Sequence, residues 1–294
     1  MEVLHCPDNL KVHFAGAENE AHYKALQILG VEYTLYTAFS WVNKYVFGQS
    51  KKFVPGATIV PTNLASGGLH CIQDSGLFTL MFGAKKDIPK DYKMLCRWYD
   101  GLVAFTLNHQ QPVTCVECDC QRVLGVDAAW EFRQRMRNDL PNNRIINVFH
   151  LPDGKYGLDR LIEFSEYIAI SVPELRLLGK KNLVPQLASY IKKKKPSIDI
   201  HLLGCTELSL MKQCRFCTSC DSTSWLSSVR YGHILGHHES KIQSDGIIEL
   251  IGKEKHDEIT QYLSLRNANA ITLNIEKLKR DYQNAAGNQD YYAL

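Results

Sequence analysis

The 294-residue sequence has no apolar run that approaches the roughly 20 residues needed to cross a bilayer. Its first residues also lack a basic stretch followed by an apolar segment, so we expect no signal peptide and a cytoplasmic location. The chain contains neither an internal repeat nor a low-complexity tract. A hydrophobic content of 45% with 22% charged residues instead predicts a globular protein with a sizeable core.

Neither sign of charge dominates the composition. The chain has 34 Lys and Arg residues against 31 Asp and Glu residues, a net charge of +3. This mild excess permits a polyanionic partner but does not require one, because the clustering of basic residues decides whether nucleic acid is bound.

The ten cysteines are not arranged as a disulfide framework. Cys71, Cys115 and Cys220 lie inside apolar, strand-like runs, where a reduced cysteine behaves as a small hydrophobic residue. We therefore expect reduced thiols and a reducing compartment.

Apolar strand-like runs alternate with amphipathic stretches along the chain, as in a parallel sheet whose strands are joined by helices. We expect helices near residues 20–29, 130–137, 158–164 and 183–191. The expected strands are residues 11–15, 33–39, 70–73, 113–117, 144–149, 167–171 and 198–203, with a short eighth strand that ends at Asp221. Eight strands with intervening helices predict an α/β fold, a closed (β/α)₈ or TIM barrel.

We expect residues 1–294 to form a single catalytic domain, with the barrel at about 11–235 and a short helical extension at about 236–294. Residues 44–68 are rich in Gly, Pro, Ser and Thr and predict a long functional loop after the second strand. The four lysines at 192–195 predict a solvated helix end.

Two aspartates, Asp74 and Asp221, each follow an apolar strand and precede Ser-Gly or Ser-Thr. In strand–helix repeat folds, the carboxyl ends of the strands carry the chemistry. The pair therefore favours an active site with two carboxylates. The alternative for each aspartate is a helix N-cap, for which Asp is also well suited.

Several of these segments resemble those of one enzyme family. Residues 73–78 (Gln-Asp-Ser-Gly-Leu-Phe) resemble the Asp-Ser-Gly-Gly-Phe motif of the tRNA-guanine transglycosylases, and residues 220–222 resemble their nucleophile segment. Further segments are similar to the base-binding strands of that family: 148–150, 167–174 and 201–206. The viral, DpdA-type DNA-guanine transglycosylases are more similar still at residues 14–18, 147–150, 201–206 and 221–225.

The resemblance implies a base exchange in which Asp221 attacks the anomeric carbon and Asp74 acts as the acid/base group. It also implies that a carboxylate reads the adjacent N–H donors of the base; Asp119 fits this role, and Glu117 stays open as the alternative. His150 would donate to the carbonyl of the base, although a lone histidine at a strand end is often only a core residue. The remaining expected substrate-binding residues are Ser75, Ser171 and Gly204.

The implied partners are DNA and a 7-deazaguanine base such as 7-cyano-7-deazaguanine, in the host cytoplasm if the protein is phage-encoded. The candidates for contacts with DNA phosphates are Lys51 and Lys52 in the predicted loop, and Arg230 and Lys241 after the last strand. The oligomeric state stays open.

The sequence also departs from the tRNA enzymes, which bind a structural zinc through cysteines after the last strand. Here no cysteine follows Cys220, and no tRNA-binding domain is recognisable, which favours DNA over the alternative substrate, tRNA. Cys214, Cys217 and Cys220 have metal-site spacing, but Cys217 and Cys220 are expected in the strand that carries Asp221, so we predict free thiols and no cofactor. A structural zinc, an iron–sulfur barrel enzyme and a non-catalytic nucleic-acid-binding barrel are the alternatives.

Overall fold

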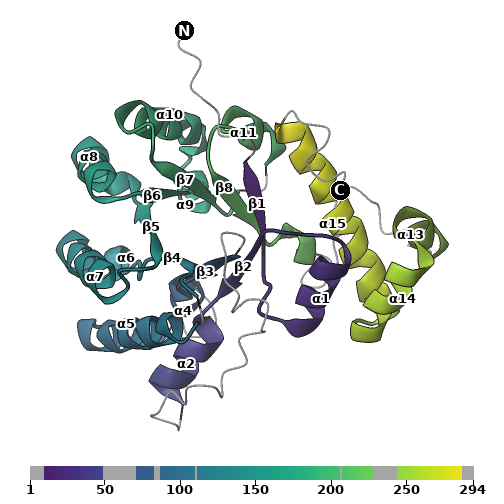
Figure 1. Ribbon diagram of the computed structural model, residues 1–294. Helices are drawn as coiled ribbons and strands as arrows, with labels where there is room; N and C mark the ends of the chain where they lie inside the picture. The colour runs from purple at the N-terminus through teal and green to yellow at the C-terminus, as the bar shows by residue number, and fades with distance from the viewer. Residues whose placement is uncertain are drawn as a thin grey trace. The chain divides into compact units, whose positions relative to one another are not determined.

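The computed structural model describes residues 10–48, 71–82, 87–109, 111–205, 207–227 and 244–286. Its strands form a closed parallel barrel in the order β1 to β8 (Figure 1). The strands are β1 (Lys11–Ala15), β2 (Thr34–Thr37), β3 (Cys71–Asp74), β4 (Thr114–Val116), β5 (Arg144–Phe149), β6 (Tyr167–Ser171), β7 (Asp199–Leu203) and β8 (Ser219–Ser222). Helices connect successive strands, so the fold is a (β/α)₈ barrel, as the alternation of apolar and amphipathic segments predicted.

Two of the described helices begin at a side-chain N-cap. The side chain of Asn19 accepts from the N–H of His22 ahead of α1, and that of Asp91 accepts from the N–H of Met94 ahead of α5. The helices up to β6 are α1 (Glu20–Ile28), α2 (Phe39–Phe47), α4 (Leu77–Phe82), α5 (Tyr92–Leu107), α6 (Gln121–Leu124), α7 (Val126–Asp139), η1 (Leu151–Asp153) and α8 (Gly154–Phe164). Those after β6 are α9 (Val172–Leu177), η2 (Lys181–Leu183), α10 (Val184–Lys194), α11 (Leu208–Gln213), η3 (Ser224–Leu226), α13 (Ser244–Ile251), α14 (Lys253–Tyr262) and α15 (Leu265–Ala286).

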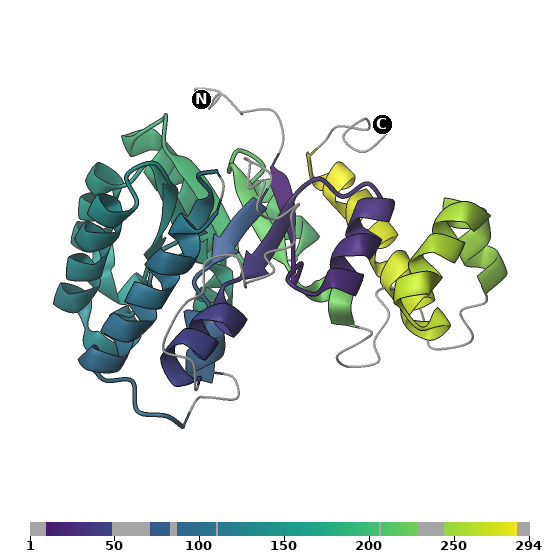
Figure 2. The same cartoon turned by 60° about the horizontal axis from the view of Figure 1, so that its bottom comes forward.

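Internal contacts divide the chain into two compact units. The first comprises residues 1–34, 172–190 and 200–294, and the second comprises residues 35–171 and 191–199. In the first unit, α14 lies beside α1 and α13, as Figure 2 shows. Helices α13 to α15 make up the described part of the predicted C-terminal extension.

The core of the first unit is built around Trp225 of η3, which is fully buried. Its indole N–H donates to the carbonyl of Ala15 at 2.9 Å, and its own carbonyl accepts from the side chain of Asn274 at 3.0 Å. The ring of Phe14 meets Trp225 and Tyr282 edge-on, at centroid distances of 6.4 and 5.8 Å. These contacts fix α15 against η3 directly after β8.

The core of the second unit is a layer of aromatic residues between β3 and helices α2, α5 and α7. Trp98, Phe105 and Phe132 are buried, and Trp41 stacks on Phe105 at 4.8 Å. The indole N–H of Trp98 donates to the carbonyl of Ser75 at 3.1 Å, which anchors the segment between β3 and α4.

The predicted strands and helices are confirmed, with shifts of boundaries. Three expectations need correction. Residues 44–47 of the expected loop belong to α2, and its residues 49–68 lie outside the described part of the chain. Cys217 precedes β8 rather than lying in it. Lys192 is not solvated: its side chain is buried and donates to the carbonyls of Ile198 and Pro196. Lys195 likewise donates to the carbonyl of Ser165, at 2.7 Å. Lys193 and Lys194 are exposed at the end of α10, as predicted.

No described helix has both the length and the apolar character that a membrane span requires.

Candidate active site

The carboxylate of Asp221 is held at the end of β8 by two contacts to one oxygen. Its Oδ1 accepts from the backbone N–H of Gly204 at 2.7 Å. The Nε2 atom of His201 lies 3.3 Å from the same oxygen, a charge–dipole contact rather than a linear hydrogen bond. Because β7 and β8 are paired with His201 opposite Ser219, the strand register itself brings these groups together. Asp221 is only 8% exposed, so its orientation is fixed by the protein.

His201 is fully buried and bridges Asp221 and Ser219. Its Nδ1 lies 2.5 Å from the hydroxyl oxygen of Ser219. A carboxylate can only accept hydrogen bonds, so in the neutral ring the hydrogen is assigned to Nε2, facing Asp221, and the Ser219 hydroxyl donates to Nδ1. The chain Ser219–His201–Asp221 therefore orients the imidazole and presents its N–H to the carboxylate.

His13 of β1 is a second buried histidine beside this chain. Its ring centroid lies 6.2 Å from that of His201, and its Nδ1–H donates to the carbonyl of Thr34 at 3.0 Å. Burial, with a smaller effect of the His201 charge, lowers the pKa of His13 to about 3. His13 is thus neutral at physiological pH and adds no positive charge near Asp221.

Gly204 can hold its position only as a glycine. Its φ is +60°, a left-handed conformation that residues with a side chain rarely adopt. A Cβ at this position would also lie 2.7 Å from Cγ of Pro173. The backbone N–H that contacts Asp221 depends on this conformation.

The carboxylate of Asp74 closes a turn at the end of β3. Its Oδ2 accepts from the N–H of Gly76 at 2.9 Å, two residues on, which is the geometry of an Asx turn ahead of α4. Gly76 has a φ of +76°, and a Cβ there would lie 2.7 Å from the Cα atom of Phe39. The Ser-Gly sequence after Asp74 therefore serves a tight turn, and Asp74 itself is half-buried.

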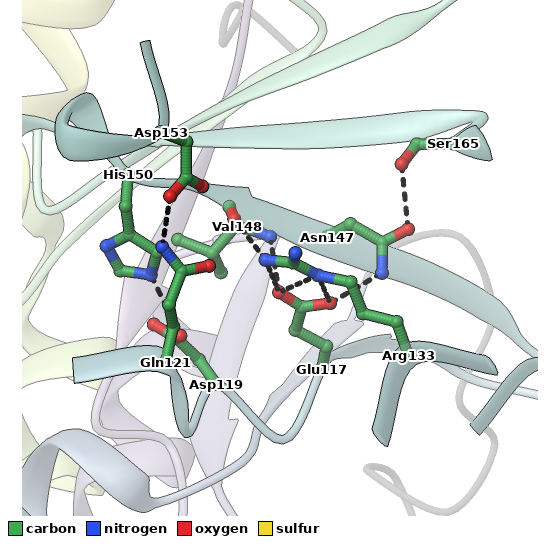
Figure 3. A network of polar contacts seen from close by, with 9 residues as sticks. All are labelled: Glu117, Asp119, Gln121, Arg133, Asn147, Val148, His150, Asp153 and Ser165. Atoms are coloured by element: carbon green, nitrogen blue, oxygen red, sulfur yellow. Dashed lines mark hydrogen bonds and ion pairs between the residues drawn. The ribbon is translucent and has the colours of Figure 1, made fainter. Parts of the chain in front are cut away.

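Glu117, one of the two expected base-reading carboxylates, lies in a buried ion pair with Arg133 of α7 (Figure 3). The guanidinium approaches both carboxylate oxygens at 2.9 to 3.1 Å. The same oxygens also accept from the side chain of Asn147 at 2.6 Å and the backbone N–H of Val148 at 2.9 Å. Burial lowers the pKa of Arg133, but the charge of Glu117 outweighs this effect and raises it above its ordinary value. Both carboxylate oxygens of Glu117 therefore already accept hydrogen bonds from groups of the protein itself.

Asp119, the other expected carboxylate, is paired with His150 (Figure 3). Its Oδ1 accepts from Nε2 of His150 at 2.8 Å, and its carboxylate also accepts from the backbone N–H of Gln121. Burial raises the pKa of Asp119, but His150 and the more distant Arg133 outweigh this effect and hold the pKa below its ordinary value. The side chain of Asp119 is 25% exposed, so a ligand can reach it.

The remaining expected site residues are distributed as follows. Ser171 is the half-buried last residue of β6, and Ser75 is buried between Asp74 and Gly76. The candidates for phosphate contacts, Lys51, Lys52, Arg230 and Lys241, lie outside the described residues.

The cysteines with metal-site spacing are Cys214, Cys217 and Cys220, and all three are buried. Within the described ranges, no group of three or more His, Cys, Asp or Glu side chains is arranged to hold a metal ion. Burial raises the pKa of Cys220 well above its ordinary value and that of nearby Cys205 to about 12, which disfavours the thiolate form that metals bind. The described residues therefore offer no support for a zinc or iron–sulfur centre.

Sequence reasoning missed several residues that surround the expected ones. These are His13, His201 and Ser219 around Asp221, Arg133 and Asn147 around Glu117, and Gln121 with its partner Asp153 beside Asp119. The two histidines carried a signal, because each interrupts an otherwise apolar strand with a polar side chain.

The structure thus contains two groups of polar residues, one around Asp221 in the first unit and one around Asp119 in the second. In each group a carboxylate is oriented by a histidine and by a backbone N–H. No protein-family model and no curated protein matches the sequence. A functional assignment therefore depends on the geometry of these two groups.

Proposed function

We propose that this protein is a transglycosylase that exchanges guanine in DNA for a 7-deazaguanine base. The observation that carries the proposal is the buried carboxylate of Asp221, held at Oδ1 by Gly204 and His201. A carboxylate that the protein orients through one oxygen leaves its other oxygen for attack on an electrophilic carbon. This is the arrangement that a covalent glycosyl–enzyme intermediate requires.

In the proposed reaction, Oδ2 of Asp221 attacks C1′ of the target nucleotide, and the bond between C1′ and N9 of guanine breaks. The departing guanine takes a proton from Asp74, which enters this step as the acid. Asp74, now a carboxylate, removes the N9 proton of the incoming base. That nitrogen then attacks C1′ and displaces Asp221. The exchange consumes neither an oxidant nor an energy source.

We assign recognition of the base to Asp119 and His150. A guanine-type base presents N1–H and a 2-amino group on one edge, and an ionised carboxylate is the acceptor that matches two adjacent N–H donors. The lowered pKa of Asp119 keeps this acceptor ionised at neutral pH. Glu117 is the less suitable candidate, because Arg133, Asn147 and Val148 already occupy its oxygens. We assign to Glu117 instead the support of the strand ends that carry Asp119 and His150.

We favour DNA as the substrate because residues 14–18, 147–150, 201–206 and 221–225 resemble the DNA-type enzymes more than the tRNA enzymes. A target within a duplex has to be flipped out before its C1′ and its base edge are both accessible. Single-stranded DNA and mismatched guanines are therefore the substrates of choice for a first assay.

The test is mass spectrometry of nucleosides after incubation of the protein with DNA and 7-cyano-7-deazaguanine, with a parallel incubation on tRNA. The proposal predicts 7-deazaguanine nucleosides in DNA with wild-type protein and none with Asp221→Asn. The matched control is Asp100→Asn, since Asp100 is an exposed surface residue whose ion pair with Arg135 spans 3.4 Å. Incorporation into tRNA alone would show that the substrate is RNA rather than DNA. Incorporation into neither would overturn the proposal.

A further inference from the structure

Gln121, the first residue of α6, holds a buried oxygen that no described residue satisfies. The residue is 8% exposed. Its side-chain nitrogen, Nε2, donates to Oδ1 of Asp153 at 2.6 Å. Its oxygen, Oε1, is buried and accepts no hydrogen bond from any residue in the described ranges. A buried carbonyl oxygen of this kind is unfavourable unless a partner is supplied, so it points to a ligand that brings an N–H or O–H donor.

The orientation of the Gln121 amide is set by its neighbour. The carboxylate of Asp153 can only accept, so the amide must turn its nitrogen toward Asp153 and its oxygen away. A flipped amide would place two oxygens against each other. Figure 3 shows the Gln121 side chain between Asp153 and the pair formed by Asp119 and His150. The protein thus fixes an acceptor, rather than a donor, at this point.

Gln121 is also tied to the carboxylate that would read the base. Its backbone N–H donates to the carboxylate of Asp119. The guanidinium in the same cluster, that of Arg133, is bound by Glu117 and by the carbonyl of Val148 at 2.9 Å. The guanidinium of Arg133 is therefore already engaged, and no described residue donates to Oε1 of Gln121.

We propose that Oε1 of Gln121 accepts a hydrogen bond from the 2-amino group of the bound base. This inference rests on the proposed function and adds a specificity-determining residue to it. A guanine-type edge carries three N–H hydrogens, one on N1 and two on the 2-amino group. The carboxylate of Asp119 accepts from the N1 hydrogen and from the amino hydrogen next to it. Oε1 of Gln121 accepts from the other amino hydrogen. Bases that lack the 2-amino group leave this oxygen unpaired and bind more weakly.

The test measures equilibrium binding of guanine and of hypoxanthine, which lacks the 2-amino group, to the full chain by calorimetry. The variant is Gln121→Met, which keeps the length of the side chain and removes the acceptor. Gln213→Met is the matched control, because Gln213 is an exposed glutamine on α11. We expect the preference of wild type for guanine to fall about 10-fold in Gln121→Met, the usual effect of one hydrogen bond to a buried acceptor, and to stay unchanged in Gln213→Met.

A second variant, Asp153→Asn, covers the case in which Gln121→Met fails to fold. An asparagine at 153 can donate as well as accept, so the Gln121 amide is free to rotate, and we expect the preference for guanine to fall here too. An unchanged ratio of the two affinities in the folded variants would overturn the role of Gln121 but leave the proposed function intact. If wild type binds neither base, both are overturned.

Discussion

The Nε2 atom of His201 lies 3.3 Å from Oδ1 of Asp221, the same oxygen that accepts the backbone N–H of Gly204. The imidazole and the backbone N–H come from β7 or the residue directly after it, while the carboxylate comes from β8. Two adjacent parallel strands thus supply the carboxylate and the two groups that hold it. This relationship makes Asp221 an oriented carboxylate rather than a solvated one.

Replacement of His201 by glutamine should slow the proposed base exchange about 10- to 100-fold. The expected loss is that of a close polar contact that orients a charged group, at about 1.4 kcal/mol for each tenfold change in rate. His201 would act through Asp221 and not on the substrate, so kcat should fall while the Kd for DNA stays unchanged. Rates at saturating DNA, together with DNA binding measured by fluorescence anisotropy, check this. A variant with wild-type kcat would reduce His201 to a core residue.

Asp74→Asn should lower the rate of exchange by about 10² to 10⁴, the range for loss of a positioned acid/base group. An asparagine oxygen can still accept from the N–H of Gly76, so the turn ahead of α4 should survive. A thermal unfolding curve like that of wild type would show that it does. If Asp74→Asn retained wild-type exchange, Asp74 would be a turn residue only.

Removal of the charge of Glu117 should destabilise the protein strongly. Glu117→Gln leaves the guanidinium of Arg133 buried without its counter-charge, and breaking such a pair costs about 3–5 kcal/mol. The exposed pair of Asp100 and Arg135 provides the comparison, since Asp100→Asn should change the free energy of unfolding by less than about 1 kcal/mol. Urea denaturation of the two variants measures both values. Equal, small effects would contradict a structural role for Glu117.

The stability of the protein should fall as the pH is lowered below about 6.5 because of His13. The folded pKa of His13 is about 3, whereas the unfolded chain takes up the proton near pH 6.5. Between these values the unfolded state binds more protons, so the free energy of unfolding decreases by up to about 1.4 kcal/mol per pH unit as the pH falls. His13→Gln should flatten this dependence in urea denaturation curves between pH 5 and 7.5. Parallel curves for variant and wild type would show that His13 is not the titrating group.

The barrel could be predicted from the sequence because most of its strands are short, largely apolar runs that alternate with amphipathic stretches. Residues 11–15, 144–149 and 167–171 were predicted with the bounds that the structure gives them. Hydrophobic periodicity is a local property, so it can be recognised in the sequence without knowing which strand pairs with which. The positions of Asp74 and Asp221 at strand ends were predictable for the same reason.

The partners of the site residues could not be predicted in this way, because they are distant in sequence. Glu117 pairs with Arg133 sixteen residues later, and Gln121 bonds Asp153 thirty-two residues later. No local pattern distinguishes Glu117, which is saturated by its neighbours, from Asp119, which is 25% exposed. The lysines near 192 misled for a related reason: a charge run predicts solvent, but the side chain of Lys192 turns back to the carbonyl of Ile198.

The covalent bond proposed between Asp221 and the sugar of DNA is tested most directly by incubating the protein with a guanine-containing oligonucleotide without an incoming base. The mixture is then denatured, and the DNA-linked peptide is mapped by mass spectrometry. We expect an adduct on Asp221 with wild-type protein, an adduct that disappears on addition of 7-cyano-7-deazaguanine, and none with Asp221→Asn. An adduct on another residue, or one that Asp221→Asn still forms, would contradict it.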